Sequence, residues 1–519
     1  MALVMVFCFA ACKGDGEGTG SSGGTTASGT TSGGTTSGGT VSKGPVKEGI
    51  IKPLKSTDPT NPATYTLDVM TSMDEWEVPA SKYDKEAAAL LKTIEANPDT
   101  LKPKSGGKAI YVSNDGNDTT ATGAKDKPYA TIKKAIGVAK SGDVIYLNRG
   151  DYWRETGIIV PSGVSIGAYG SGNKPTVLGS PQNYAEQKWT ETETENVYRT
   201  LLSGASNVGA VVLNHGQGVG DMKTDVKALR EEFDFYEDLS KGVLYMYMSQ
   251  GNPADVCDDI AFCSGFNLLN IKSNTTVQNV RIMYTGRHGV SMTSDDNSSN
   301  DNVKFEGMVL GYIGGSKQNS SVRLGNAIEV WGQCNNYVID KCHVYQCYDA
   351  GLTMQYESDS TKELHEENIK FTNNLLEYNY YSIEYFFTCN KNAKSSIRNV
   401  DVSGNVIRWS GYGWGEWSRS DRGNAAAVQG RDNAMRTENF VFKNNIFDLS
   451  YASKNKVSNL IRVTGVDSSE LPTFVGNTYA QIPDELVVTS MSDKASIKAD
   501  GAAGVLALLG DSSGKVVSY

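Results

Sequence analysis

Prolines, basic clusters and long apolar segments are all scarce in this sequence, and each scarcity excludes a class of protein. The chain has 519 residues with only 14 prolines but 55 glycines, and its apolar runs are mostly short. This composition favours many tight turns between short strands over a helical protein. The formal net charge is -10 and no basic patch stands out, which argues against a nucleic-acid partner. After the first twelve residues, no apolar run is long enough to span a bilayer.

The chain begins with an apolar leader. The segment "MALVMVFCFAAC" ends in small residues and Cys12, a pattern similar to the lipobox of a bacterial lipoprotein signal peptide. We expect residues 1–12 to be the signal peptide and Cys12 to be the lipidation site. Because no Lys or Arg precedes the apolar run, an ordinary leader or a start farther upstream is the alternative. Residues 13–44 are a Gly/Ser/Thr-rich flexible linker and residues 45–105 an N-terminal extension, in a cell-surface lipoprotein or a secreted protein.

The cysteines are predicted to pack rather than to react. Two of the eight lie in the leader, and the spacings of the other six fit no zinc site. Four of the six fall within the repeats described next, where a small buried side chain stacks on its neighbours. A disulfide between Cys257 and Cys263 remains open for a protein outside the cytoplasm. The six are Cys257, Cys263, Cys334, Cys342, Cys347 and Cys389.

Internal repeats indicate the fold. Segments such as "NYVIDKCHVYQCYDAGLTMQY" and "NIKFTNNLLEYNYYSIEYFF" each contain three short strands separated by polar turns. Repeats of about 22 to 45 residues that cannot bury their apolar face alone are typical of a solenoid. We therefore predict an all-β fold, a right-handed parallel β-helix over residues 106–481, with a less regular insertion at about 186–265 and a C-terminal cap at 482–519. A structural ladder is expected at the turn residues Asn373, Asn374, Asn405, Asn444 and Asn445.

The N-terminal side of the repeats adds a helix and a resemblance. Ile132, Ala135, Ile136 and Ala139 follow helical spacing, which predicts an amphipathic helix that caps the open end of the solenoid. The strings "YVSNDGND", "KPYATIKKAI" and "GDVIYLNRGDYWRE" resemble the opening of pectate-lyase-like, right-handed β-helix carbohydrate-active proteins. The resemblance covers about residues 107–480. It implies the fold but not the reaction, because that superfamily includes lyases, hydrolases and non-catalytic members.

Two glutamates interrupt strands that otherwise read as buried. We align the third strands of successive repeats on Val290, Ile328, Leu352, Ile383, Ala426 and Ile461. This places Ser291, Glu329, Thr353, Glu384, Ala427 and Arg462 in one column that faces away from the core. Glu329 and Glu384 are then two strands apart, so their backbones are separated by about 9.6 Å. That distance is close to the separation of acid and base in an inverting glycosidase.

Further candidates surround this column. Asp349 lies at the turn into the intervening coil, where a third carboxylate either belongs to the catalytic group or tunes the pKa values of the other two. Aromatic rings stack on the apolar faces of sugars, and polar side chains bind hydroxyl or carboxylate groups. The predicted substrate-binding residues are His288, Trp331, Gln355, Tyr356, Tyr385, Trp414, Trp417 and Arg462.

Three functions remain open. A glycoside hydrolase needs two carboxylates and no cofactor, which the glutamate column favours. A polysaccharide lyase needs a basic residue and charge neutralisation of a uronate, often by Ca²⁺; Arg462, Asp295 and Asp296 keep this alternative open. The third function is a non-catalytic carbohydrate-binding surface protein. In each case the expected partner is a polysaccharide or oligosaccharide, with membrane contact only through the lipid.

Overall fold

The computed structural model describes residue 51 and residues 79–320, 322–390, 392–419, 425–431, 436–451, 459–464, 471–483, 486–489 and 497–519. The chain divides into two units, Met1–Val41 and Ser42–Tyr519, and every described residue belongs to the second. The predicted signal peptide, Cys12 and the linker lie outside the described residues. A search of the described part finds no helix with the length and apolar character needed to cross a membrane.

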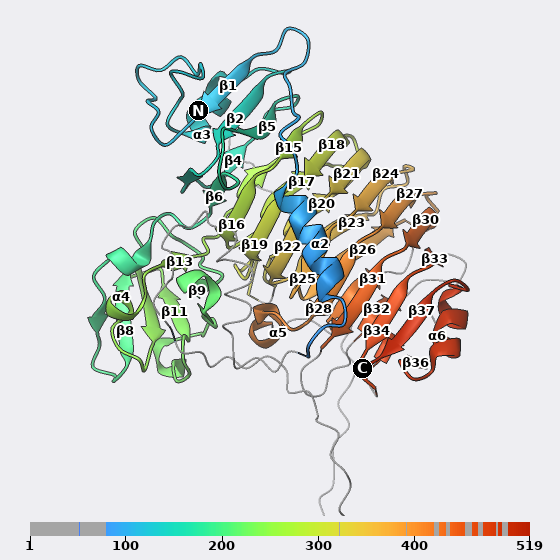
Figure 1. The fold of residues 1–519 in the computed structure, drawn as a ribbon. Helices are drawn as coiled ribbons and strands as arrows, with labels where there is room; N and C mark the ends of the chain where they lie inside the picture. The colour runs from blue at the N-terminus through green and yellow to red at the C-terminus, as the bar shows by residue number, and fades with distance from the viewer. Residues whose placement is uncertain are drawn as a thin grey trace, which may run out of the picture. The chain divides into compact units, whose positions relative to one another are not determined.

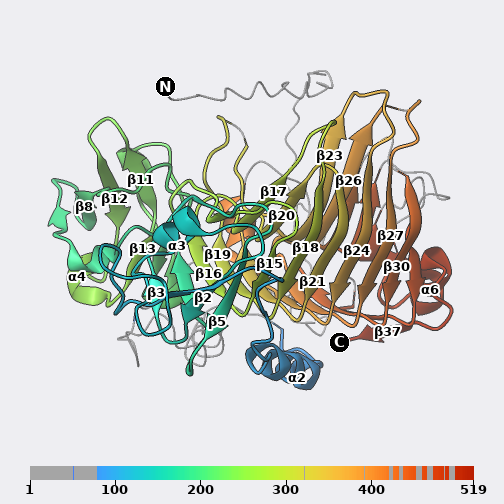
Figure 2. The ribbon, with the colours of Figure 1, turned by 90° about the horizontal axis from the view of Figure 1, so that it is seen from above.

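Three ten-stranded sheets form the walls of a right-handed parallel β-helix (Figure 1, Figure 2). The first sheet contains β1 (Ala109–Val112), β2 (Val144–Asn148), β5 (Ser165–Tyr169), β15 (Thr276–Gln278), β18 (Asn300–Glu306), β21 (Cys334–Asp340), β24 (His365–Thr372), β27 (Ser396–Ser403), β30 (Thr437–Lys443) and β33 (Thr473–Val475). The second contains β3 (Tyr152–Trp153), β6 (Thr176–Leu178), β16 (Arg281–Thr285), β19 (Val309–Ile313), β22 (His343–Cys347), β25 (Leu375–Glu377), β28 (Val406–Ser410), β31 (Ile446–Ser450), β34 (Thr478–Gln481) and β37 (Lys515–Ser518).

The third sheet carries the column of predicted acids. It contains β4 (Ile158–Ile159), β14 (Leu269–Asn270), β17 (Val290–Thr293), β20 (Ile328–Trp331), β23 (Ala350–Ser358), β26 (Tyr381–Cys389), β29 (Ala426–Arg431), β32 (Asn459–Thr464), β35 (Leu486–Thr489) and β36 (Ile497–Lys498). From β15 to β35, each coil gives one strand to the first, second and third sheet in turn. The pairs are parallel except β35 with β36, so equivalent residues of successive coils stack in columns.

The insertion lies between β6 and β14 and builds small antiparallel sheets of its own. One consists of β7 (Thr190–Glu191), β8 (Val197–Leu201), β12 (Val243–Tyr247) and β11 (Phe235–Asp238); the other of β10 (Gly218–Val219), β9 (Val211–Leu213) and β13 (Ile260–Phe262). Short helices complete it: η1 (Tyr184–Glu186), η2 (Asn214–Gly216), η3 (Val226–Ala228) and α4 (Pro253–Val256). Many of its apolar residues form a cluster separate from the solenoid core, whereas Val212, Val219 and Ala261 cluster with residues of the second sheet.

The core of the solenoid follows from alternation along the strands. Ile328, Leu352 and Ile383 pair in register on neighbouring strands and are all fully buried in the main apolar cluster. Helix α3 (Ile132–Val138) buries Ile132 and Ala135 in the same cluster, in agreement with the helix expected from the sequence. All six described cysteines are buried and form no disulfide, which leaves the packing interpretation.

An asparagine ladder joins successive coils through Asn374, Asn405 and Asn445, as predicted, whereas the side chain of Asn373 donates to Asp340 instead. The side chain of Asn374 donates to Oδ1 of Asn405 at 3.0 Å, that of Asn405 to Asn445 at 2.9 Å, and that of Asn445 to Asn477 at 3.0 Å. Each amide also donates to a backbone carbonyl of the preceding coil. Asp511 ends the ladder, because its carboxylate accepts from the backbone and the side chain of Asn477. Paired amides therefore hold these turns together.

Residues 79–101, here called the strap, run along the solenoid from its last coils to its first. The carbonyl of Pro79 accepts from Trp409 Nε1 at 3.0 Å, and Lys82 Nζ donates to the carbonyl of Ser518 at 2.8 Å. At the other end, the carbonyl of Leu101 accepts from the hydroxyl of Tyr146 at 2.7 Å. The strap thus links coils that the solenoid connects only through their neighbours.

Helix α2 (Asp84–Glu95) forms the middle of the strap and crosses the strands of the second sheet (Figure 1). Its sequence "DKEAAALLKTIE" is rich in strong helix formers. Ala87 and Ile94 are buried and Leu90 and Leu91 are partly buried against residues of the second sheet, which is the spacing of one helix face. The sheet therefore buries the apolar side of α2.

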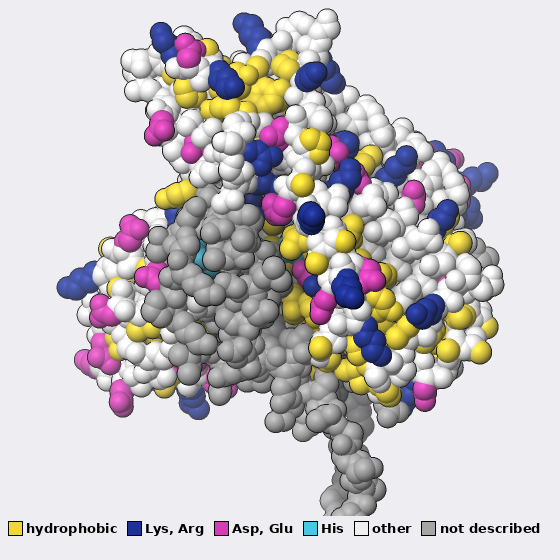
Figure 3. All heavy atoms as spheres, in the orientation of Figure 1, with side chains coloured by type: hydrophobic (Ala, Val, Ile, Leu, Met, Phe, Trp, Pro, Cys, Tyr) yellow, Lys and Arg dark blue, Asp and Glu magenta, His cyan; other side chains and the backbone are white. Residues whose placement is uncertain are grey.

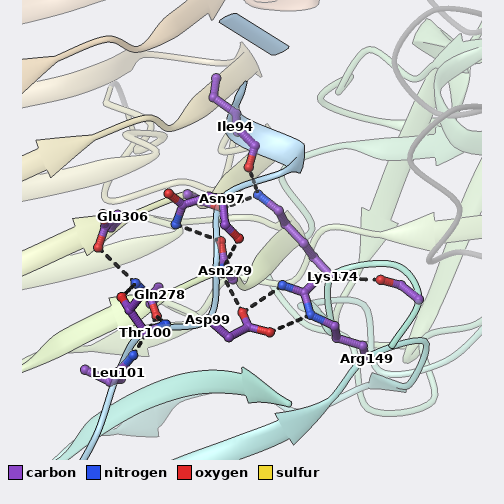
Figure 4. Close-up of polar contacts among 12 residues, drawn as sticks. Ile94, Asn97, Asp99, Thr100, Leu101, Arg149, Lys174, Gln278, Asn279 and Glu306 are labelled. Atoms are coloured by element: carbon purple, nitrogen blue, oxygen red, sulfur yellow. Dashed lines mark hydrogen bonds and ion pairs between the residues drawn. The ribbon is translucent and has the colours of Figure 1, made fainter. Parts of the chain in front are cut away.

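Polar contacts fasten the strap beyond the end of α2 (Figure 4). Asp99 accepts two hydrogen bonds from Arg149, at 2.8 and 2.7 Å, and a third from Asn279 at 2.6 Å. Gln278 accepts from the backbone N–H groups of Thr100 and Leu101. Charged, amide and backbone groups thus converge where the strap reaches the first coils.

The end of the asparagine ladder gives the first prediction. We expect Asp511→Ala to lower the free energy of unfolding by about 3 kcal/mol, because it leaves the partly buried N–H of Gly476 and the buried donors of Asn477 and Tyr479 without their acceptor. Burial raises the pKa of Asp511, but hydrogen bonds from Asn477 and Gly476 outweigh this effect, and the pKa lies below its ordinary value. The stabilisation that Asp511 provides is therefore fully present above the pKa of the unfolded chain, near 3.8, and is lost as the pH falls through the lowered pKa of the folded chain. Urea denaturation at several pH values measures it, with the exposed Asp500→Ala as the control; equal losses for both variants would contradict the ladder's role.

The strap gives the second prediction, through a buried amine. Lys174 Nζ donates to the carbonyl oxygens of Ile94 and Gly307, and burial lowers its pKa to about 8. Between that value and 10.5 the unfolded chain holds a proton that the folded chain has lost, so stability rises with pH. We expect the unfolding free energy of the wild type to rise relative to Lys174→Met across this window. The exposed Lys85→Met is the control, and parallel pH curves for wild type and Lys174→Met would refute the assignment.

Candidate functional site

The register of the third sheet confirms most of the predicted column. Ser291 pairs with Glu329, and Thr353 with Glu384, while Ile328 of β20 pairs with Leu352 of β23. Glu329 and Glu384 therefore stand two strands apart with Thr353 between them.

One member of the column was predicted wrongly. Glu384 pairs with Gln429 and not with Ala427. The register of β29 differs by two residues from the predicted alignment, so that Val428 lies opposite Ile383. Gln429 in turn pairs with Arg462, so Arg462 is confirmed as the last residue of the predicted column. A shift of two residues keeps the same face outward, so alternation alone did not reveal it.

The two glutamates face away from the core, yet they are not hydrated surface acids. Glu329 is 8% exposed and Glu384 only 1%. Charged side chains so poorly exposed need hydrogen-bonding partners, and the structure provides them.

Glu329 is held by two donors. The hydroxyl of Ser291 donates to Oε2 at 2.8 Å, and Nε2 of His288 lies 3.1 Å from Oε1. The backbone N–H of Asn326 donates to Nδ1 of His288 at 3.2 Å. Histidine was predicted to bind substrate, but the structure places its ring against the carboxylate instead.

Glu384 is held through two amides. Gln355 Nε2 donates to Oε2 of Glu384 at 2.7 Å, and Oε1 of Gln355 accepts from Asn326 Nδ2 at 3.3 Å. Oδ1 of Asn326 accepts from the backbone N–H of Ala350 at 3.1 Å. Asn326 therefore contacts the partners of both glutamates, one through its backbone and one through its side chain.

Asp349 is occupied by an ion pair. Arg419 Nη1 lies 2.6 Å from Oδ1 of Asp349 and also donates to the carbonyl of Tyr348 at 3.1 Å. Arg419 follows the short helix α5 (Trp414–Ser418) and is 2% exposed. Although burial works against the charged guanidinium, the Asp349 carboxylate holds the pKa of Arg419 above its ordinary value. Asp349 therefore anchors the segment around α5.

Tyr381 lies among the charged groups of the site. Burial raises the pKa of its hydroxyl to about 12; Arg419 and Arg462 oppose this shift, and Glu384 and Asp349 add to it. The hydroxyl therefore keeps its proton at neutral pH. Arg462 is partly exposed and donates to Oε1 of Gln429.

Two of the predicted aromatic residues, Trp331 and Tyr356, contact each other. Trp331 is partly buried two residues after Glu329 on β20, where it packs edge-on against Tyr356 and Phe386. Tyr356 is nearly buried, and its hydroxyl donates to Asp296 at 2.5 Å. The side chain of Trp417 lies outside the described residues.

Two aromatic predictions are wrong. Tyr385 is 0% exposed and packs in the core against Phe440, because it follows the outward Glu384 on the strand and so points inward. Trp414 is also 0% exposed, and its Nε1 donates to the carbonyl of Gln346 at 2.9 Å. Both side chains are packing residues that a substrate does not reach.

The acidic loop proposed for Ca²⁺ is held by internal hydrogen bonds. Asp295 accepts from Asn297 and Ser298, and the backbone bond from Asn297 is the main cause that lowers its pKa. Asp296 accepts from Tyr356 and Ser358. Within the described ranges, no three His, Cys, Asp or Glu residues form a group that could hold a metal ion.

Sequence reasoning missed Asn326, Tyr381 and Gln429. A signal for Asn326 was present, because the string "GNA" opens the strands of both "GNAIEVWG" and "GNAAAVQG". Tyr381 carried no such signal, since its neighbours Arg419 and Arg462 come from other coils.

These features define a parallel β-helix protein with a polar, largely buried site on the outer face of one sheet. The family described as "Protein of unknown function (DUF1565)" matches residues 114–384, more than half of the chain, and the chain belongs to this family. A comparison with curated proteins found no match.

Several solved structures are similar in fold. One described as a glycoside hydrolase shares 10% identity over 74% of this chain and 94% of its own, with a TM-score of 0.44. Pectate lyase Pel9A shares 11% over 76% and 80%, with a TM-score of 0.40. PfbA, a surface adhesin of Streptococcus pneumoniae, shares 15% over 70% and 75%, with a TM-score of 0.34. Likenesses at this level do not assign a reaction.

The ion pair of Asp349 gives the third prediction. Asp349→Asn leaves the buried Arg419 without its carboxylate, and we expect it to cost about 3 to 5 kcal/mol in the free energy of unfolding. The double variant Asp349→Asn/Arg419→Met should recover most of this loss. Glu367→Gln, which breaks the partly exposed pair with Arg398, should cost less than about 1 kcal/mol. A fully stable Asp349→Asn variant in urea denaturation would show that Asp349 is not a structural anchor.

Proposed function

We propose that the chain is a carbohydrate-active enzyme, a glycoside hydrolase that uses Glu329 and Glu384 as its catalytic carboxyl groups. The observation that carries this proposal is the pairing of two outward, nearly water-excluded glutamates, each held by polar side chains. Two strand spacings separate their backbones by about 9.6 Å. Side chains that lean toward one another reduce this distance to the range of an inverting glycosidase, which leaves room for a water molecule.

In this mechanism one carboxyl group protonates the oxygen of the glycosidic bond as the bond breaks. The other takes a proton from a water molecule that attacks the sugar from the opposite face. A site with little bulk water strengthens the electrostatic effect of each group. The product sugar has the inverted anomeric configuration, and neither step needs a metal ion.

The surroundings of the glutamates suit a sugar chain. Trp331 is partly exposed beside Glu329 and offers a ring face or edge to the apolar side of a sugar. Gln429 and Arg462 continue the outward column beyond Glu384 and offer polar groups to hydroxyls. On the face seen in Figure 3, the coloured Lys and Arg side chains are interspersed with Asp and Glu.

A polysaccharide lyase is the second candidate. Arg419 and Arg462 both lie near the Tyr381 hydroxyl, and a lyase needs cationic groups close to the carboxylate of a uronate. The ion pair of Arg419 with Asp349 weakens this candidate, because that arginine already has a counter-ion. A non-catalytic carbohydrate-binding protein is the third, and it would bind the same face without turnover.

We further propose that Cys12 attaches the protein to a membrane and that residues 13–44 hold the β-helix away from it, outside the cytoplasm. The support is the composition of the two segments alone.

The catalytic assignment gives the fourth prediction. On a polysaccharide that the wild type cleaves, Glu329→Gln and Glu384→Gln should each lower turnover by about 10² to 10⁴, because amides cannot transfer the proton. Glu438→Gln, at an exposed glutamate of the first sheet, should leave turnover unchanged.

The assay should read reducing ends and the absorbance of unsaturated products together, on a panel of plant and microbial polysaccharides. Reducing ends without unsaturation support the hydrolase, and unsaturated products support the lyase. Binding without either signal supports the non-catalytic protein. Near-normal turnover in both glutamate variants would remove the column from the mechanism.

A further inference from the structure

We infer that the first coils carry a second carbohydrate-binding site, on the outer face of the first sheet, and that it binds a polysaccharide containing uronate residues. The inference rests on the proposed function for the general class of ligand. It goes beyond that function because this face belongs to a different wall of the solenoid from Glu329 and Glu384. Two neighbouring features carry it: a platform of three tyrosine rings and a hollow lined by two lysines.

The platform consists of Tyr111, Tyr146 and Tyr169 on β1, β2 and β5. Tyr111 pairs in register with Tyr146, and their rings stack with centroids 5.4 Å apart, while Tyr169 meets Tyr111 edge-on at 4.9 Å. Ile110 and Val112 lie in the solenoid core, so alternation turns Tyr111 outward. All three tyrosines are partly exposed, and Figure 3 shows hydrophobic side chains gathered over these strands. Such rings suit the apolar face of a sugar.

The platform is held in shape by the end of the strap. The hydroxyl of Tyr146 donates to the carbonyl of Leu101 at 2.7 Å, which fixes the direction of this ring. Gly167 follows Tyr146 in the same column of the sheet, and a Cβ atom there would lie 3.3 Å from Cδ2 of Leu101. The glycine thus lets the strap lie close to the sheet. A platform that is ordered before binding loses little conformational entropy when a ligand arrives.

A hollow of about 130 Å³ adjoins the platform on the same face of the sheet. Val144 and Ser165 line it, and they pair on β2 and β5 two residues before Tyr146 and Gly167. Leu101 lines it as well, so the platform and the hollow share this residue. A single ligand can therefore contact both.

The charge of the hollow favours an anion. Lys102 and Lys104 line it, both are exposed, and neither forms an ion pair within the described part of the chain. Asp143 also lines it, but its two oxygens accept from the backbone N–H groups of Lys108 and Lys140, both at 2.7 Å. The hollow therefore offers two ammonium groups to a ligand carboxylate.

The opposite end of the platform favours a hydroxyl group. Ser113, two residues after Tyr111, donates to Asp151, which also accepts from the backbone of Asn114. Burial and the nearby Asp151 carboxylate raise the pKa of Tyr169, so this end keeps a negative charge beside a neutral phenol. A ligand carboxylate is disfavoured there, whereas a sugar hydroxyl can donate to Asp151. A uronate-containing chain supplies the carboxylate, the hydroxyl and the apolar ring face together.

Hydrogen exchange gives the first arm of the fifth prediction, because it reports where a polymer binds. The full chain carrying Glu329→Gln is used so that the proposed mechanism cannot cleave the ligand. We expect polygalacturonate or alginate oligomers to protect residues 99–112, and carboxyl-reduced polygalacturonate to protect them less. Protection of β20 and β26 reports the proposed active site separately. If none of these uronate oligomers protects residues 99–112, the inference is overturned, whatever happens at the glutamates.

The lysines are tested by affinity electrophoresis with the same polymers. Lys102→Gln/Lys104→Gln should weaken binding of the uronate polymer by about tenfold at low salt, and the difference should shrink as salt screens the charges. Lys85→Gln/Lys92→Gln removes two exposed charges on α2 and is the matched control. Equal losses in the two double variants would overturn the role of the hollow.

The rings are tested in the same assay. Tyr111→Ser/Tyr169→Ser should weaken binding by about tenfold, whereas Tyr111→Phe/Tyr169→Phe should retain most of it, because stacking needs the ring and not the hydroxyl. Tyr236→Ser is the control, since this partly exposed ring of the insertion also stacks on a tyrosine. Thermal melting checks that each variant folds. Serine variants that fold and bind normally would overturn the platform, as would serine variants that only dissociate a dimer of this chain.

Discussion

The fixed register between parallel coils is the constraint on which the rest of this structure depends. Strands of the third sheet pair so that equivalent positions of β17, β20, β23 and β26 stand side by side. Residues that are far apart in the sequence are thereby placed at intervals of one strand spacing, about 4.8 Å. The asparagine ladder keeps the turns in the same register, and Asp511 closes it. The position of Glu329 relative to Glu384 is a consequence of this stacking and not of any local motif.

Much of the fold could be predicted because its signals repeat. Polar turn residues and alternating apolar residues recur in every coil, so the β-helix, the outward column and the ladder at Asn374, Asn405 and Asn445 were visible in the sequence. The strap was not, since "DKEAAALLKTIE" shows a helix with one apolar face but not the sheet that covers it. Only the folded chain shows that the strap reaches both the last coils and the first.

The site could be predicted only where a single strand determined it. Glu329 and Glu384 were found by alternation, but the same rule fits two registers of β29, and the wrong one was chosen. For Tyr385, alternation already pointed inward, and the density of aromatic residues was the misleading signal. The ion pair of Asp349 with Arg419 joins separate parts of the chain, and so do the hydrogen bonds that run from Asn326 through Gln355 to Glu384. Such contacts depend on side-chain geometry that no periodic pattern encodes.

A crystal structure of Glu384→Gln with an oligosaccharide that the wild type cleaves would show directly whether Glu329 and the side chain at position 384 flank the bond that is cleaved. We expect a sugar chain on the outer face of the third sheet. Its glycosidic oxygen should lie within hydrogen-bonding distance of one of the two side chains, at position 329 or 384, with a water molecule between the anomeric carbon and the other. A sugar bound on another sheet or on the insertion, with both positions out of contact, would contradict it.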